Sequence, residues 1–166
     1  MCVYALRDVL GRQDGALRVP YAEHALAVAR RLASLGSFPE AVCAAILHEC
    51  FEQGLISAQE ASQRYGSEVA ALLQSAGEPG DLTARLLGAC DQLQHLHELA
   101  ELGLGLLPER VNCLWALLRK LPPRFRQPLS DELAALTGPL PAAPAARSVR
   151  SYRPVASPRG RSSDLN

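Results

Sequence analysis

Apolar residues recur along most of the chain at the three- and four-residue spacing of amphipathic helices. The segment 21–35 is the clearest case, because Leu26, Ala29 and Ala33 fall near one face and Gly36 follows as a terminator. Alternating β-branched runs, the usual sign of strands, are absent from the sequence. The pattern therefore predicts an all-α fold of about seven helices.

The segment 39–53 is predicted to be the most buried helix. Pro39 suits a first helical turn, and Gly54 follows the last turn. Between them, residues 41–47 read AVCAAIL, so this helix is apolar on every side. A helix without a polar face belongs in the middle of a bundle.

Cap and turn signals divide the rest of the folded part into further helices. Ser57 and Glu60 form a predicted capping box, Gly66 separates two short helices, and Asp81 is a predicted cap for a long one. The predicted helices that follow the first two cover residues 58–65, 67–76, 82–103, 109–121 and 126–137.

Composition and charge change the picture at the C-terminal end. From Pro139 onward the chain is rich in Pro, Ala, Ser and Arg, with five arginines against one aspartate, a net charge of +4. Such a segment cannot bury enough apolar surface to offset its ordering entropy, so we predict a folded domain over 1–138 and a disordered tail over 139–166. Because the whole chain has no formal net charge, nucleic-acid binding is not favoured, and an electrostatic contact between the tail and an acidic partner stays open.

The cysteines and the absence of long apolar runs bear on the compartment. Five cysteines without CxxC spacing indicate a reducing environment rather than a disulfide framework. The N-terminus lacks the apolar core of a signal peptide, and no run of about 18 apolar residues exists. We therefore expect a cytoplasmic protein without a membrane contact. The oligomeric state stays open, with a homo-oligomer among the alternatives.

Four polar residues interrupt the apolar helices and are candidate ligands of one metal ion: His24, the adjacent pair His48 and Glu49, and Asp91. A buried imidazole or carboxylate needs a partner, because an unpaired charge in a protein interior is costly. One shared divalent ion would satisfy all four, and two imidazoles with two carboxylates suit Mn, Fe, Co or Zn. The alternative for each of these residues, considered by itself, is that its role is purely structural.

Four sequence blocks around these residues resemble, in order and spacing, the hydrolase domain of the alarmone hydrolases, which are HD phosphohydrolases. The blocks read PYAEHALAVARRLASLG, AAILHECFEQG, YGSEVAALL and LLGACDQLQHLHEL. The family has PYxxHPLAVA, AALLHDxxEDT, FGxEVAxLV and KLADRLHNM in these places. The resemblance covers residues 3–136. It implies an HD-domain helical bundle with a central metal pocket, in which His24, His48, Glu49 and Asp91 hold Mn²⁺ or another divalent transition metal.

The resemblance also implies catalytic and substrate-binding residues, and here the chain departs from the family pattern. Glu49 stands where the family has Asp. The family's Glu-Asp pair, which positions the attacking water, reads Glu52-Gln53, and Gln53 can hydrogen-bond but cannot accept a proton. His95 replaces an Asn that lines the family's site, and Arg18 is the one residue left of a basic stretch that holds the substrate.

Members of this family cleave the 3′-pyrophosphate from guanosine tetra- or pentaphosphate. With these departures we expect a metal-dependent phosphohydrolase of reduced or shifted activity, acting on a nucleotide pyrophosphate or another phosphoester. In that role Glu52 would orient the attacking water. The alternative is that Glu52 is only a solvated residue at the end of a helix. The alternative for the whole chain is a catalytically silent protein that binds an alarmone, a nucleotide or a protein partner.

Overall fold

The structure, a computed structural model, describes residues 2–12, 18–75 and 81–137. These residues form eight α-helices and no strand, which confirms the all-α prediction, where about seven helices were expected. The helices are α1 (Cys2–Arg12), α2 (Arg18–Ser34), α3 (Pro39–Glu52), α4 (Ala58–Tyr65), α5 (Ser67–Ser75), α6 (Leu82–Glu101), α7 (Pro108–Leu118) and α8 (Pro123–Thr137).

Helix α3 lies inside the bundle, as its apolar sequence predicts. It contacts α1, α2, α5 and α6, and within 41–47 every residue except Val42 is buried. Most of these side chains are short, so the neighbouring helices can pack closely on all sides of α3.

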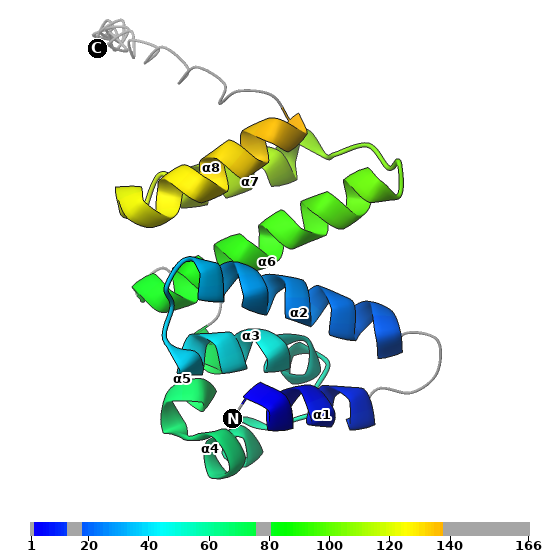
Figure 1. The fold of residues 1–166 in the computed structure, drawn as a ribbon, viewed down its shortest axis with the longest axis vertical. Coiled ribbons are helices and arrows are strands. Elements are labelled where there is room, and N and C mark those ends of the chain that lie inside the picture. Colours follow the sequence, from blue (N-terminus) through cyan, green and yellow to red (C-terminus); the bar gives the residue numbers. More distant parts are fainter. Residues whose placement is uncertain (1, 13–17, 76–80, 138–166) are drawn as a thin grey trace, which may run out of the picture.

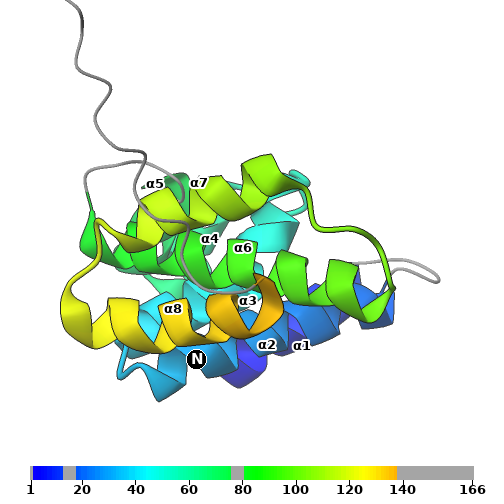
Figure 2. The ribbon, with the colours of Figure 1, turned by 90° about the horizontal axis from the view of Figure 1, so that it is seen from above.

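Helices α2 and α6 lie side by side and form the next layer. Figure 1 shows them between α3 and the pair formed by α7 and α8. Seen from above in Figure 2, α7 and α8 run alongside each other across α6, and both contact it. The three helices that carry the predicted metal ligands, α2, α3 and α6, are therefore mutual neighbours in the middle of the molecule.

The predicted caps are confirmed. The Ser57 hydroxyl accepts a hydrogen bond from the backbone N–H of Glu60 at 3.1 Å, and the Asp81 carboxylate accepts from the backbone N–H groups of Thr83 and Ala84. Gly54, which follows the end of α3, has a φ of 70°, a left-handed conformation that side chains with a Cβ rarely adopt.

Several helix boundaries differ from the predicted ones, mainly near prolines. Helix α2 begins at Arg18 rather than at residue 21, and α8 begins at Pro123 rather than at residue 126. Pro20 and Pro123 both lie in a first turn, where the missing N–H of proline has no intrahelical partner to lose. Helix α7 already ends at Leu118, before the proline pair that was predicted to end it, and Pro123 instead starts α8.

The N-terminal helix α1 is anchored on the bundle. Its Ala5 and Val9 are fully buried, and α1 contacts α2 and α3. The Tyr65 hydroxyl and the Arg64 guanidinium of α4 both donate hydrogen bonds to the Asp8 carboxylate. Helix α1 therefore covers part of the surface of α3, next to α2.

All five cysteines are free thiols, as expected for a chain without a disulfide framework. Cys43, Cys50 and Cys90 are buried, Cys2 is half-buried and Cys113 is exposed on α7. Burial raises the pKa of both the Cys43 and the Cys90 thiol to about 12. No helix in the described part of the chain is long and apolar enough to cross a membrane. The predicted tail at 139–166 lies outside the described residues.

Candidate metal centre

The four predicted metal ligands come together from three adjacent helices. His24 comes from α2, His48 and Glu49 come from α3, and Asp91 comes from α6. One ligand atom of each residue lies within 4.8 Å of the ligand atoms of the other three. The two imidazoles are buried, with 5% and 4% of their surface exposed, and the two carboxylates are nearly so.

The Asp91 carboxylate is the centre of this group. Its Oδ1 atom lies 3.1 Å from Nε2 of His24 and 2.8 Å from Nε2 of His48. The Glu49 Oε1 atom stands further off, 3.9 Å from Nε2 of His24 and 3.8 Å from Nε2 of His48. The longer side chain of Glu49 therefore reaches the same space without contacting either imidazole as closely as Asp91 does.

The other ring nitrogen of each histidine also has a fixed partner. Nδ1 of His24 lies 2.8 Å from Oε1 of Glu98, and Nδ1 of His48 lies 2.6 Å from the carbonyl oxygen of Ala45. Because a carbonyl can only accept, Nδ1–H of His48 is the donor, and the same assignment suits His24 beside a carboxylate. Metal-ligating histidines usually donate one N–H in this way, which orients the ring and leaves Nε2 for the ion.

Proton affinities follow from the same contacts. Burial lowers the pKa of His24, but hydrogen bonds with Asp91 and Glu98 and their negative charges outweigh it, so that the pKa is raised. The pKa of His48 is also raised: burial lowers it, but the hydrogen bond with Asp91 and the charge of Asp91 outweigh this effect. Burial raises the pKa of Asp91, but the hydrogen bonds from the two histidines hold it well below its usual range.

The donor set fits a divalent transition metal. With Nδ1–H donating on both rings, each neutral imidazole directs an Nε2 lone pair at the Asp91 carboxylate, which can also only accept. Oδ1 of Asp91 lies 2.8 Å from Nε2 of His48 and 3.1 Å from Nε2 of His24. Because all three atoms would then be acceptors, each close contact needs a proton or a cation between the two atoms. Two imidazoles and two carboxylates are the ligands that Mn, Fe, Co and Zn share in proteins.

The two predicted catalytic residues lie at the carboxyl end of α3. The Gln53 side-chain amide donates a hydrogen bond to Oε2 of Glu49 at 3.3 Å, so Gln53 contacts one of the predicted ligands. Glu52 is exposed, and within the described part of the chain no hydrogen bond or ion pair joins it to the four predicted ligands. It stays one helical turn beyond His48, on the same face of α3.

Of the two predicted substrate-binding residues, His95 lies at the site. Its Nε2 atom is 3.5 Å from Oδ1 of Asp91, and its ring centroid is 4.5 Å from that of His24. His95 also forms a second potential ligand group with His24 and Glu98. Arg18 is the first residue of α2, and its side chain lies outside the described part of the structure.

The sequence reasoning missed a polar chain that runs from His24 to α8. Glu98 accepts from the Gln94 amide at 3.0 Å, and the Gln94 carbonyl oxygen accepts from the Arg31 guanidinium at 3.3 Å. Arg31 also donates to both carboxylate oxygens of Glu132 on α8. A signal was present, since Arg31 follows His24 and Glu98 follows Asp91 by seven residues, two helical turns on the same face.

A cavity of about 450 Å³ opens beside His24, between the first half of α2 and the end of α6. Three glutamates, Glu23, Glu98 and Glu101, are among the described residues that line it, and no Lys or Arg is among them. The space next to the metal ligands is therefore acidic.

A family model for the HD domain matches residues 2–100, more than half of the chain, and the chain therefore belongs to the HD domain family. The match spans α1 to all but the last residue of α6 and so includes all four predicted ligands. HD domains are generally metal-dependent phosphohydrolases. No curated protein and no solved structure matches the chain.

Proposed function

We propose that this protein is a metal-dependent phosphohydrolase whose activity is lower than, or shifted from, that of the alarmone hydrolases it resembles. The observation that carries the proposal is the convergence of the His24 and His48 Nε2 atoms on Asp91, with Glu49 beside them, in an HD domain. Such a group offers both the ligands and the charge that a divalent ion needs.

In this proposal His24, His48, Glu49 and Asp91 hold the ion. When bound, a divalent ion supplies Lewis acidity, which makes water a better nucleophile and draws electron density from a phosphoryl group. The protein's own task is orientation. Glu98 and the Ala45 carbonyl fix the two imidazole rings through Nδ1, and the Gln53 amide holds the Glu49 carboxylate.

The chain departs most from the family pattern in the residues that would activate the attacking water. Gln53 cannot accept a proton, and Glu52 is left as the carboxylate nearest in sequence for that task, at an exposed position. General acid–base assistance is worth about 10²–10⁴ in rate, so we expect the loss of one acidic group to slow the reaction.

The substrate proposed here is a phosphoester with fewer negative charges than guanosine tetraphosphate. Glu23, Glu98 and Glu101 line the cavity beside His24 and would repel a polyphosphate, since like charges in a cleft lower the local concentration of an anion. A nucleoside monophosphate or a similar monoester meets less of this repulsion.

The metal claim and the reaction are tested separately. Manganese bound per chain is measured on the purified protein and on His48→Ala, in which we expect the metal to be lost; equal metal content in both would contradict the proposed ligands. Release of phosphate from nucleoside monophosphates and of pyrophosphate from guanosine tetraphosphate is then compared. Faster release from the tetraphosphate would contradict the proposed substrate class.

A second candidate is a catalytically silent HD protein that binds a nucleotide or a protein partner. The exposed position of Glu52 favours it, as does Gln53, which cannot accept a proton. Gln53→Asp discriminates between the two, because it restores the family's acidic pair. A gain in hydrolysis of about tenfold or more supports a slowed enzyme. A metal-loaded variant that stays inactive on every phosphoester supports the silent binder.

A further inference from the structure

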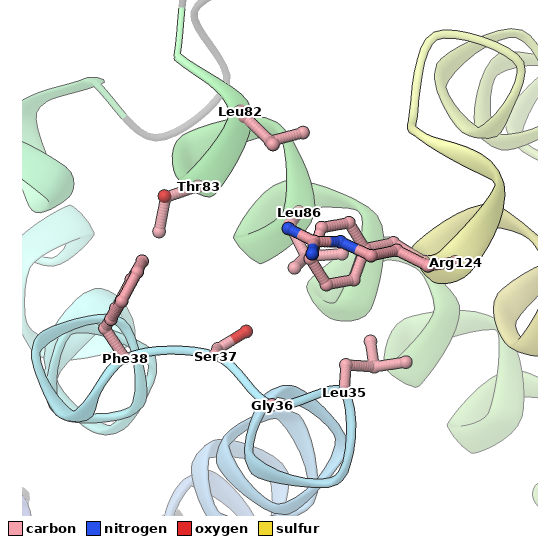
Figure 3. Close-up of a pocket in the computed structure, with 9 residues that line it drawn as sticks. Leu35, Gly36, Ser37, Phe38, Leu82, Thr83, Leu86 and Arg124 are labelled. Atoms are coloured by element: carbon pink, nitrogen blue, oxygen red, sulfur yellow. The ribbon is translucent and has the colours of Figure 1, made fainter.

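A second cavity lies at the opposite ends of α2 and α6 from the cavity beside His24. It has a volume of about 420 Å³ and lies where the turn between α2 and α3 meets the beginnings of α6 and α8. Figure 3 shows residues 35–38 of the turn below it, Leu82, Thr83 and Leu86 of α6 above, and Arg124 reaching in from α8. A cavity of this size is typical of a small-molecule site.

The floor and walls of this cavity are apolar. Leu35, Leu82, Leu86, Phe38 and Phe125 supply most of the lining side chains. Leu86 and Phe125 belong to the buried core, whereas the Phe38 ring is 72% exposed at the rim. Such a surface suits the hydrocarbon part of a ligand.

The electrostatics of the cavity favour an anion. Three helices begin at its edge: Phe38 is the N-cap of α3, and Thr83 and Arg124 are the second residues of α6 and α8. The Asp81 carboxylate already caps α6, whereas no side chain among the described residues caps α3. Helix N-termini carry partial positive charge. The one C-terminal end that borders the cavity, that of α2, is already satisfied, because the backbone N–H groups of Gly36 and Ser37 bind its carbonyls.

Arg124 and Ser37 supply hydrogen-bond donors that have no acceptor among the described residues. The Arg124 guanidinium stacks over the Phe125 ring, 4.4 Å from its centroid, and within the described part of the chain it has no carboxylate partner. The Ser37 hydroxyl is buried, has no hydrogen-bond partner among the described residues, and points toward the cavity in Figure 3. The nearby acids Glu40 and Asp81 line a neighbouring cavity, on the other side of Phe38 and Thr83.

We propose that this cavity binds a small amphipathic anion, a molecule with one carboxylate or phosphate on an apolar body. The anionic group lies between the Arg124 guanidinium and the Ser37 hydroxyl, and the apolar part packs on Leu82, Leu86 and the Phe38 ring. This site shares no residue with the metal centre and does not depend on the proposed hydrolase activity.

Octanoate and 1-octanol are the probes, titrated calorimetrically into the full-length protein in the presence of EDTA. We expect octanoate to bind and the neutral alcohol to bind at least about tenfold more weakly, since a hydrogen bond to a charged group is worth about a factor of ten or more. Equal affinities for the two, or no octanoate binding at millimolar concentration, would overturn the proposal.

Arg124→Gln and Ser37→Ala test the donors. We expect Arg124→Gln to weaken octanoate binding about tenfold and Ser37→Ala to weaken it less, because a neutral donor contributes less than a charged one. Arg126→Gln is the matched control, since Arg126 lies on the same helix and lines a different cavity. A control that loses as much affinity as Arg124→Gln would contradict the site.

Two further readouts separate this proposal from the hydrolase proposal. In amide NMR spectra, octanoate should shift Gly36, Leu82 and Leu86, whereas shifts confined to the surroundings of His24 would place the ligand elsewhere. His48→Ala, which removes a predicted metal ligand, should bind octanoate like the unaltered protein. Loss of octanoate binding in that variant would mean that the two sites are not separate.

Discussion

Glu98 is the residue whose role the structure adds to the metal centre. It accepts from Nδ1 of His24, and in turn it is held by Gln94. A carboxylate behind a ligating imidazole fixes the ring and makes its other nitrogen a better donor to a metal. Glu98 is thus a positioning residue for His24 in the proposed site.

Glu98→Ala should lower manganese affinity by about 10- to 100-fold, the range seen when a partner behind a metal ligand is removed. Glu101→Ala is the control, because Glu101 lines the same acidic cavity but, among the described residues, forms no hydrogen bond or ion pair with His24. Calorimetric titration with manganese measures both. Equal losses in the two variants would show that only the negative charge of the cavity matters.

The acid–base state of the two histidines predicts a pH dependence. Both histidines have a higher pKa in the folded protein than in the unfolded chain, where it is about 6.5. Their contribution to the stability of the metal-free protein is therefore fully present below about pH 6.5 and is lost as the pH rises through their pKa values in the folded protein. Asp91, with a lowered pKa, contributes stability above its unfolded value of about 3.9 and loses it as the pH falls toward its folded one.

Metal binding should therefore strengthen with pH, because the ion displaces the protons that the imidazoles hold. Thermal unfolding is measured in EDTA and in manganese at several pH values between about 5.5 and 8.5, a range that brackets the usual histidine pKa. We expect the difference in Tm between the two conditions to grow across this range. A difference that is constant or shrinks would contradict proton competition at the ligands.

The sequence identified the four residues that cluster in the structure, but not the residues that hydrogen-bond to them from behind. His24, His48 and Asp91 interrupt apolar stretches, and a polar residue in such a stretch is conspicuous. Glu98 and Arg31 follow two of these residues by two helical turns on the same faces, but charged residues are common on amphipathic helices, so the spacing alone did not show that they meet. The exposed position of Glu52 likewise depends on where α3 ends.

At the scale of elements, α8 is tied to the centre of the bundle by charge. Arg31 of α2 and Glu132 of α8 form a paired contact with a shortest distance of 2.6 Å, and His97 of α6 lies 2.8 Å from the same carboxylate. Partial burial acts to raise the pKa of Glu132, but the contacts with Arg31 and His97 hold it below its usual range. The apolar face of α8, with Leu129 and Leu133 buried, supplies the remaining attachment.

Glu132→Gln should lower the free energy of unfolding by about 1–3 kcal/mol, because it leaves the Arg31 guanidinium with a weakened partner in a largely buried place. Asp131→Asn, one residue earlier on the exposed face, should change it by less than about 0.5 kcal/mol. Urea unfolding followed by circular dichroism measures both. A Glu132 variant as stable as the control would mean that apolar packing alone holds α8.

Element boundaries were harder to predict than element existence. Capping at Ser57 and Asp81 follows from the chemistry of single side chains, and the prediction is confirmed there. Proline is ambiguous, because it can close one helix or open the next. At Pro123 the chain does the second, and the sequence offers no local feature that decides between the two.

At the scale of the whole molecule, the matched HD region ends at residue 100, before α7 and α8. These two helices nevertheless cover α6, whose Leu86, Leu93 and Leu96 are almost fully buried. Exposing such a face costs roughly 25 cal/mol per Å² of apolar surface. The last two described helices are therefore part of the same core as the helices that carry the ligands.

A chain ending at residue 138 should unfold with the same midpoint as the full-length protein, as the predicted domain boundary requires. A chain ending at residue 103 should fail to show a cooperative transition, since the buried leucines of α6 would face water. Calorimetry on both fragments checks this. Cooperative unfolding of the shorter fragment would show that the matched region folds without α7 and α8.

The unequal burial of the cysteines gives the molecule a built-in reporter position. The Cys43 and Cys90 thiols, with pKa values of about 12, are almost entirely protonated at neutral pH, and only a thiolate reacts readily with alkylating labels. Cys113 stands exposed on α7, a helix that contacts α6 directly. A nitroxide spin label on Cys113 would sense a paramagnetic Mn²⁺ through its relaxation rate, and would place the ion relative to α7 in solution without any need for a known substrate.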